Sequence, residues 1–281
     1  MDRLCFGIAV YGQQMPEWWM QFALNMGTLQ KYNIELAGME VGRSMLTDSN
    51  RNRIVSRFLK GTADWLFWVD ADNVIPVGGI RRLLDTGFEV VSGLYYQKSP
   101  PYIPVAYRKL PNGRYKSIEN WNRGELLPID AAGMGCCLVH RCVFEKIEKE
   151  FIPYQRTTGG ITLVHKNDFK GKLPPLTYNG AKPFVKNGNL IEPLHTPDFE
   201  IEAFPHFILE YGRTEDMIFY ENAIRAGFVP HVDTSVEVGH VGNITINGKD
   251  YRETLKKNIE TTPRVTEYVN VEMMEADDES M

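Results

Sequence analysis

One stretch in the first third of the chain constrains the fold more than any other. Residues 65–69 are five consecutive apolar residues, Trp-Leu-Phe-Trp-Val, and the aspartates Asp70 and Asp72 follow directly. An unbroken apolar run rich in aromatic and β-branched side chains is typical of a strand buried on both faces, as in a parallel sheet. Positions i and i+2 place both carboxylates on one side of the chain at the carboxyl end of that strand, where open α/β folds bind ligands.

These two aspartates have two interpretations. As hard oxygen donors at a sheet edge, they suit Mg²⁺ or Mn²⁺ carrying a phosphorylated ligand. Alternatively, Asp-x-Asp is short enough to occur by chance, and an aspartate after a strand is often only a turn residue or a helix N-cap. The buried strand before the pair, and Pro76 opening a helical segment at 79–84 after it, favour ligand binding.

The remaining pattern predicts the fold class. Strand-like and helix-like segments alternate, at 4–10, 16–29, 34–39, 54–59, 65–72, 78–85 and 89–96, with a further strand at 136–139 and a helix at 141–150. Such alternation indicates an α/β fold with a mostly parallel central sheet and right-handed crossovers. Short strand-like pieces between prolines and glycines from residue 99 to 124 indicate a small antiparallel excursion. In the first helix, Trp19, Phe22, Ala23 and Met26 have the spacing of a core face.

Two further charged groups lie at expected helix starts. Arg51 and Arg53 follow a cluster of N-cap residues in what we expect to be a first helical turn, where the helix dipole favours anions. They indicate an anionic neighbour such as a diphosphate, or else two solvated arginines paired with carboxylates. Glu215 and Asp216 follow the N-cap Thr214 of a helix ending at Gly227, and complementing the helix dipole would be sufficient reason for them.

Composition limits the classes of partner. A net charge of −5 argues against broad electrostatic binding of nucleic acid. No apolar run approaches the roughly 20 residues of a transmembrane helix, and the start has no signal-peptide pattern, so a cytoplasmic protein is expected. We expect one catalytic domain over 1–260, interrupted by a loop-rich, lid-like insertion at 152–206, and an acidic, flexible tail at 261–281. Four cysteines without paired spacing read as buried free thiols.

Taken in order, these pieces resemble a family. The sequence is similar to GT-A type glycosyltransferases, of the small single-domain kind often found in phage and other viral genomes. The resemblance spans about residues 4–242 outside the insertion and rests on the first strand with its Tyr11-Gly12 loop, the Asn50-Arg51-Asn52-Arg53 helix start, Trp65 to Asp72, the strand at 133–137, Glu215-Asp216 and His240. It implies a Rossmann-like α/β/α sandwich that uses a nucleotide-diphospho-sugar, in the host cytoplasm if the protein is viral.

The resemblance also implies roles. Asp72 would be the principal ligand of Mn²⁺ or Mg²⁺, Asp70 a ribose or metal contact, and His240, expected in a tight loop between glycines, a further metal ligand, although a lone histidine is as often structural. Asp216 would act as general base toward an acceptor hydroxyl, with inversion, and Glu215 would orient it. Residues expected to contact the UDP- or GDP-sugar donor are Tyr11, Arg51, Arg53, Asp70 and Asp72.

Other interpretations stay open. Retaining enzymes also combine Asp-x-Asp with a late histidine, so inversion depends on Asp216 alone. A metal-dependent nucleotidyltransferase or hydrolase would use Asp70 and Asp72 on a nucleotide without a sugar. A noncatalytic nucleotide- or carbohydrate-binding protein would keep its function without Asp216. The aromatic residues Tyr95, Tyr96 and Trp121 are candidates for stacking on a sugar or for the core. The acceptor, a glycan or another hydroxyl compound, is not specified by the sequence.

Overall fold

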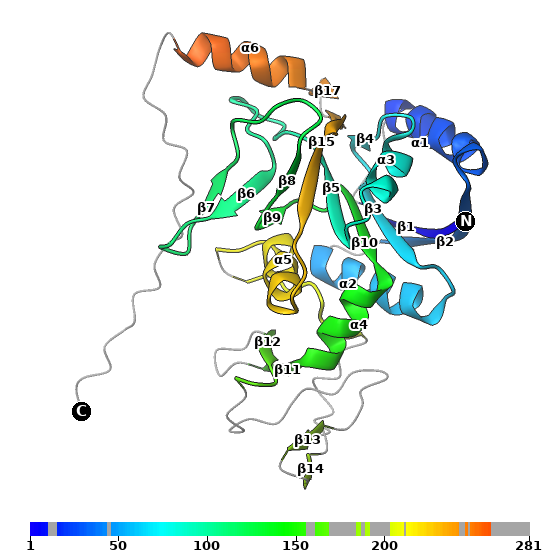
Figure 1. Cartoon of the computed structure of the whole chain (residues 1–281), viewed down its shortest axis with the longest axis vertical. Helices are drawn as coiled ribbons and strands as arrows, with labels where there is room; N and C mark the ends of the chain where they lie inside the picture. Colours follow the sequence, from blue (N-terminus) through cyan, green and yellow to red (C-terminus); the bar gives the residue numbers. More distant parts are fainter. Residues whose placement is uncertain are drawn as a thin grey trace.

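The computed structural model describes residues 1–10, 16–43, 46–155, 161–168, 184–186, 189–191, 203–210, 212–241, 245–246 and 248–259. Within these ranges the largest sheet has seven strands, and Figure 1 shows it at the centre of the molecule. In spatial order they are β2 (Ile34–Gly42), β1 (Asp2–Ala9), β3 (Trp65–Asp70), β10 (Cys136–His140), β5 (Val90–Leu94), β15 (His231–Glu237) and β8 (Leu126–Pro128).

Strand directions confirm a mostly parallel sheet and add one detail that the sequence pattern does not predict. Strands β2, β1 and β3 are parallel to one another, and β5 is parallel to β15. Strand β10 lies antiparallel between β3 and β5, and β8 lies antiparallel at the edge. Because Cys136 of β10 pairs with Val69 of β3, β10 begins at the sheet edge where β3 ends. Residues just before β10 therefore approach the Asp-x-Asp segment.

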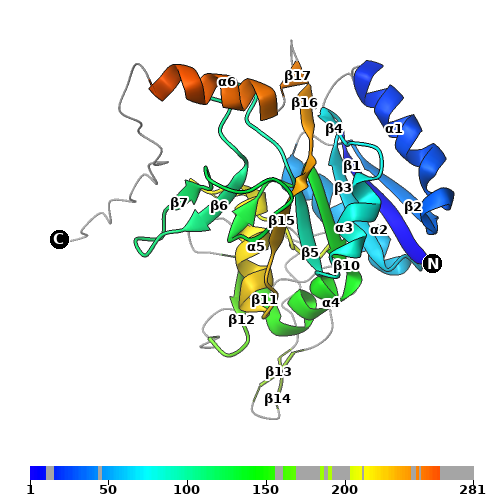
Figure 2. The ribbon, with the colours of Figure 1, turned by 45° about the horizontal axis from the view of Figure 1, so that its top comes forward.

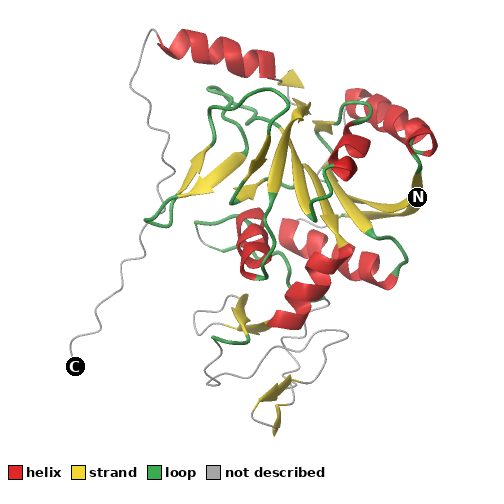
Figure 3. Ribbon diagram, viewed as in Figure 1, coloured by secondary structure: helices red, strands yellow, loops and turns green. Residues whose placement is uncertain are grey.

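Helices cover both faces of this sheet, as Figures 2 and 3 show. One face carries α1 (Pro16–Thr28) and α3 (Gly79–Asp85); the other carries α2 (Thr47–Lys60), α4 (Arg141–Glu150) and α5 (Glu215–Arg225). The alternation of side chains along β3 explains both layers, since Leu66 and Trp68 belong to one core while Phe67 and Val69 belong to the other. The architecture is an α/β/α arrangement consistent with a Rossmann-like fold.

Helix α1 buries a face that coincides only in part with the expected one. Trp19, expected in the core, is 53% exposed, whereas Trp18 and Asn25 are buried. Both buried side chains donate hydrogen bonds to backbone carbonyls, Trp18 Nε1 to Asp70 (2.9 Å) and Asn25 Nδ2 to Ile75 (2.9 Å). These polar contacts orient the helix, so Phe22 and Met26 pack on the core as predicted, whereas Trp19 and Ala23 are exposed.

Two smaller sheets bear on the site. The antiparallel sheet β7–β6–β9 (Tyr115–Ser117, Ala106–Lys109, Ala131–Ala132) confirms the antiparallel excursion. A second sheet joins β4 (Asn73–Val74), β16 (Gly239–Val241) and β17 (Thr245–Ile246). The prediction that His240 lies in a tight loop is wrong, because His240 is in β16 and pairs with Asn73. That pairing brings the late histidine next to the Asp-x-Asp segment.

The expected insertion at 152–206 lies partly outside the described residues. Its described parts form the hairpin of β11 (Phe151–Gln155) with β12 (Ile161–His165) and the hairpin of β13 (Phe184–Lys186) with β14 (Asn189–Ile191). The short helix η1 (Gln30–Tyr32) precedes β2, and α6 (Gly248–Ile259) is the last described element. The acidic tail at 261–281 is outside the described residues. Within the described helices, none is long and apolar enough to cross a membrane.

Helix α2 begins seven residues before its apolar stripe, which starts at Ile54. Its first residue is Thr47, so Arg51 and Arg53 lie beyond the first turn. The prediction that two cations oppose the dipole in the first turn is therefore wrong, since the dipole acts mainly within that turn. The position of Arg51 needs another explanation, which its ion partners provide.

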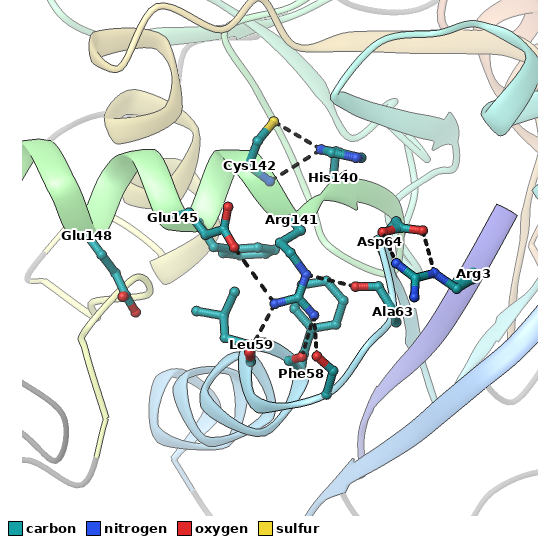
Figure 4. A network of polar contacts seen from close by, with 12 residues as sticks. Arg3, Phe58, Leu59, Ala63, Asp64, His140, Arg141, Cys142, Glu145 and Glu148 are labelled. Atoms are coloured by element: carbon teal, nitrogen blue, oxygen red, sulfur yellow. Dashed lines mark hydrogen bonds and ion pairs between the residues drawn. The ribbon is translucent and has the colours of Figure 1, made fainter.

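The other end of α2 is held by a single arginine, drawn in Figure 4. Arg141, the first residue of α4, donates hydrogen bonds from its guanidinium to the carbonyls of Phe58, Leu59, Gly61 and Ala63 at 2.9–3.0 Å. The last carbonyls of a helix have no partner within the helix, and a cation there also complements its dipole. Arg141 thus fixes α2 to the junction between β10 and α4.

Candidate functional site

Asp70 and Asp72 lie at the sheet edge where the parallel strands end, but in different local settings. Asp70 is the last residue of β3 and pairs with Ala9 of β1, whereas Asp72 follows in a turn before β4. The Asp70 N–H donates to the Gly135 carbonyl (3.3 Å), and the Val241 N–H donates to the Asp72 carbonyl (2.7 Å). The backbone of this segment is held from both sides, by the residues preceding β10 and by β16.

Arg51 connects Asp70 to the acidic pair at the start of α5. Its side chain is only 3% exposed and packs over the ring of Trp68. Arg51 Nη2 lies 3.2 Å from Asp70 Oδ1, and Arg51 Nε lies 3.4 Å from Glu215 Oε1 and 3.7 Å from Asp216 Oδ1. Arg51 and Glu215 are 164 residues apart in sequence. The fold therefore gathers the Asp-x-Asp strand and the Glu-Asp helix start into one buried ionic cluster.

Burial and mutual charge perturb the titration of this cluster. Burial would lower the pKa of Arg51, but the charges of Asp70, Asp216 and Glu215 raise that pKa overall. Burial raises the pKa of Asp70 against the opposing charge of Arg51. Burial also raises the pKa of Asp216 well above its ordinary value, with Arg51 opposing and the charges of Glu215 and Asp70 adding to the rise. Asp216 is therefore a carboxyl group with an enhanced affinity for a proton.

Asp72 has its own pair of partners. Lys98 Nζ lies 2.5 Å from Asp72 Oδ2, and His240 Nε2 lies 3.6 Å from Asp72 Oδ1. Burial alone would raise the pKa of Asp72, but the hydrogen bonds from His240 and Lys98 lower it overall. Asp72 is thus held in its ionised form.

The ring of His240 has a defined tautomer when it is neutral. His240 Nδ1 lies 2.7 Å from the carbonyl oxygen of Tyr96. Since a carbonyl only accepts hydrogen bonds, Nδ1 carries a proton and Nε2 is the nitrogen on the side of Asp72. Nε2 can donate to Asp72 when the ring is protonated and can bind a metal when the ring is neutral. A second partner that fixes the tautomer in this way is typical of metal-binding histidines.

These side chains fit a divalent cation with few protein ligands. Asp70, Asp72, Glu215 and Asp216 place four carboxylates here against the two cations Arg51 and Lys98. Mg²⁺ is usually held by one or two carboxylates together with water and phosphate oxygens, and imidazole and carboxylate both suit Mn²⁺. Among the described residues, no group of three or more His, Cys, Asp or Glu side chains is arranged to hold a metal. Asp72 and His240 are the pair that fits.

Tyr95 is the buried aromatic residue closest to both parts of the site. Its hydroxyl oxygen accepts the N–H of Gly135 (3.1 Å), and its ring meets the ring of His240 edge-on at 5.7 Å. Tyr95 and Tyr96 are both buried, so neither ring is exposed for stacking on a sugar. Trp121 stacks on Tyr251 at 5.9 Å. In this structure the three aromatic residues pack within the protein.

The structure does not bring all of the expected donor contacts together. Arg53 is exposed and lines a cavity of about 260 Å³ with Asn52 and Phe207, and none of the carboxylates bound by Arg51 lines it. Tyr11 lies outside the described residues. The residues gathered at the sheet edge are therefore Arg51, Asp70, Asp72, Glu215, Asp216 and His240.

Lys98 and Gly135 contact this cluster, and sequence reasoning did not assign either of them to it. Lys98 follows β5, and Gly135 precedes β10. Their positions in the sequence could have indicated this, because residues that follow a parallel strand and residues that precede an antiparallel strand lie at the same edge of a sheet. Using it requires knowing that β10 lies between β3 and β5, which depends on tertiary structure.

Comparisons with known proteins were made for the whole chain. No protein-family model matches, and no curated protein matches in sequence. Protein A197 from STIV matches with a TM-score of 0.46 and 16% identity over 86% of each chain. A glycosyltransferase involved in the glycosylation of the major capsid of PBCV-1 matches with a TM-score of 0.29 and 12% identity, over 52% of this chain and 62% of that one.

A third structure, described as a glucose-1-phosphate thymidylyltransferase from Bacillus anthracis in complex with a sucrose, matches with a TM-score of 0.29 and 10% identity. The match covers 53% of this chain and 74% of that one. With TM-scores below 0.5, these likenesses identify neither the substrate nor the reaction. Function has to be inferred from the site itself.

Proposed function

We propose that this chain is a GT-A type glycosyltransferase that depends on a divalent metal. It moves a sugar from a nucleotide-diphosphate donor to an acceptor hydroxyl, with inversion. The observation that supports this most is the ionic cluster in which Arg51 joins Asp70 to Glu215 and Asp216. A carboxyl group with a raised pKa thereby lies beside a sheet edge where Asp72 and His240 fit a cation.

Each part of the cluster has a chemical task in this proposal. Asp72 and His240 would hold Mn²⁺ or Mg²⁺, which when bound offsets the charge developing on the leaving diphosphate. Asp216 accepts the proton of the acceptor hydroxyl while the oxygen of that hydroxyl bonds to the anomeric carbon. The bond from that carbon to the diphosphate oxygen breaks, and its electron pair leaves on the diphosphate. A pKa raised by burial makes Asp216 a stronger base than an ordinary aspartate.

Arg51 and Glu215 act on Asp216 rather than on the reacting atoms. The guanidinium of Arg51 contacts both carboxylates of α5, and this fixes their side chains relative to β3. Because the Arg51 side chain is almost fully buried beneath its three partners, we assign it a positioning role. Glu215 contacts the same guanidinium and helps to orient Asp216.

The test is isothermal titration of UDP and GDP, with and without Mn²⁺, against the wild type and Asp72→Ala. Tight binding of one nucleotide that requires both Mn²⁺ and Asp72 is the expected result. Asp85→Ala is the control, since Asp85 is 60% exposed and pairs with Arg81, which in turn pairs with Asp2 at the opposite end of the sheet. Metal-independent binding, or binding of neither nucleotide, would remove Asp72 from the proposed role.

A further inference from the structure

A cavity of about 540 Å³ opens beside Asp216. Its walls come from the sheet β7–β6–β9, from the end of β5 and from the segment that leads into α5. The lining residues are Gln97, Val105, Tyr107, Tyr115, Ala132, Gly133, Leu209, Glu210, Gly212, Arg213, Thr214, Asp216 and Met217. This volume lies within the roughly 300–1,000 Å³ typical of small-molecule sites. The carboxyl group proposed as the base forms part of its wall.

The charges of the wall discourage an anionic ligand. Arg213 is the only cation among the described lining residues, and both of its terminal nitrogens contact carboxylates, Nη1 that of Glu221 (2.6 Å) and Nη2 that of Glu210. Glu221 also binds Lys109 Nζ at 2.5 Å. Glu210 and Asp216 outnumber Arg213, so the lining has a formal charge of −1. No described lining cation is left to neutralise a phosphate or a carboxylate of the ligand.

The remaining wall is apolar and aromatic with a few fixed polar groups. Tyr107 and Tyr115 line the cavity but are only 6% and 4% exposed, so they form part of its apolar wall and not an open face for stacking. The Tyr115 hydroxyl donates to Glu221 Oε1 at 2.8 Å, which fixes that ring. Leu209, at the rim, is 57% exposed. Apolar walls with a small number of oriented polar groups suit a ligand that has apolar faces and many hydroxyls, such as a sugar ring.

We infer that this cavity is the acceptor subsite and that it selects an uncharged, hydroxyl-rich acceptor, a neutral sugar, over a phosphorylated one. Naming it the acceptor subsite depends on the proposed transferase function. The selectivity depends only on the wall, where Arg213 is already paired and the net charge is negative. A phosphate group would lie beside the carboxylates of Glu210 and Asp216, and the one lining cation, Arg213, is already paired, so electrostatic complementarity disfavours it.

Saturation-transfer NMR on the full chain tests this inference. The probes are the methyl glycosides of glucose, galactose, mannose and N-acetylglucosamine, and the 6-phosphates of the same sugars. At least one glycoside is expected to bind the wild type, and its 6-phosphate at least about tenfold more weakly at low salt. Binding is expected to be lost in Met217→Trp, which fills the cavity, and retained in Met39→Trp, at an exposed position on β2.

A second cavity variant keeps the test informative if Met217→Trp does not fold. Leu209→Trp narrows the rim at an exposed position, so it is expected to fold and to weaken the same glycoside. The inference is overturned if no glycoside in the set binds, if binding survives both cavity variants, or if a 6-phosphate binds as tightly as its neutral parent.

The nucleotide titration separates this inference from the proposed function. If a glycoside binds the cavity but neither UDP nor GDP binds through Asp72, the transferase proposal fails while the selectivity of the cavity stands. If a nucleotide binds as proposed but the glycosides fail, the transferase proposal stands and the neutral acceptor is refuted.

Discussion

Replacing Arg51 by methionine tests whether the buried cluster holds the site together. Methionine keeps an unbranched apolar stem but removes the guanidinium, which lies over the Trp68 ring and carries the charge shared by three carboxylates at 3.2–3.7 Å. At an effective dielectric constant of about 20, each pair contributes roughly 5 kcal/mol of attraction before the burial cost of several kcal/mol per ion is subtracted. Removing one partner of a buried ionic group leaves the others uncompensated, so we expect a loss of about 3–5 kcal/mol in the free energy of unfolding.

The loss caused by Arg51→Met should depend on pH with a defined sign. In the wild type the charge of Arg51 opposes the rise in the pKa of Asp70 and Asp216, so both values rise further in the variant. A carboxyl whose folded pKa is raised binds its proton more tightly in the folded state. The stabilisation of the folded state by this tighter proton binding is therefore fully present below the unfolded pKa of about 3.9, and it is lost as pH rises through the folded pKa. The difference from the wild type should be small near pH 4 and grow as pH rises through the raised folded pKa values of Asp70 and Asp216.

Urea unfolding at several pH values, followed by circular dichroism, measures this loss. Arg53→Met is the matched control because Arg53 is an exposed arginine on the same helix, and a change within about 0.5 kcal/mol is expected. A deficit below 1 kcal/mol for Arg51→Met at pH 8, or one of the same size from pH 4.5 to pH 8, would refute this account of the cluster.

Three further outcomes are expected. Asp216→Asn should lower kcat by roughly 10²–10⁴-fold and abolish the acid limb of the pH–rate profile. In the wild type this limb should lie above the ordinary carboxyl range, because burial raises the pKa of Asp216. An acid limb that persists in the variant would point to a different base. Lys98→Met removes a half-exposed competitor for Asp72, the proposed metal ligand, so electron paramagnetic resonance should detect Mn²⁺ binding up to about fivefold tighter without nucleotide. Weaker binding would contradict this competition. Gly135→Ala would place Cβ 2.5 Å from Asn73 Oδ1 and should lower the free energy of unfolding in urea by about 1–3 kcal/mol. Gly27→Ala, in open space on α1, is the control and should be neutral or stabilising. Equal stability of the two variants would refute the steric conflict.

Much of the fold could be predicted because its signals are local. The apolar run at 65–69 forms β3, Pro16 opens α1, and Thr214 precedes α5. These patterns depend on side-chain type and spacing over a few residues. The mostly parallel sheet follows from their alternation along the chain.

What could not be predicted depends on contacts between distant residues. The burial of Trp18 and Asn25 follows from hydrogen bonds to Asp70 and Ile75, carbonyls some 50 residues away that apolar periodicity cannot reveal. The insertion of β10 against the direction of its neighbours is likewise a property of the whole sheet.

The candidate site shows the same division between local and distant signals. The sequence and its family resemblance predicted metal or ribose contacts at Asp70 and Asp72 and a general base at Asp216. The fold gathers Asp70 and Asp216 around Arg51. Pairing of Arg51 with carboxylates was one of the two alternatives, but it is buried and its partners come from distant elements. The contact of Lys98, which follows β5, with Asp72 likewise depends on the tertiary structure. The roles of these residues in catalysis stay predictions.

The hydrogen bonds of Arg141 have a consequence for how the molecule opens. Helix ends normally fray first, because their last carbonyls can exchange partners with water at little cost. At the end of α2 those carbonyls are bound by a guanidinium that belongs to another helix. Amide protons near Phe58 should therefore exchange with solvent only when α4 detaches too, which would couple the helix that carries Arg51 to α4 in one cooperative unfolding unit.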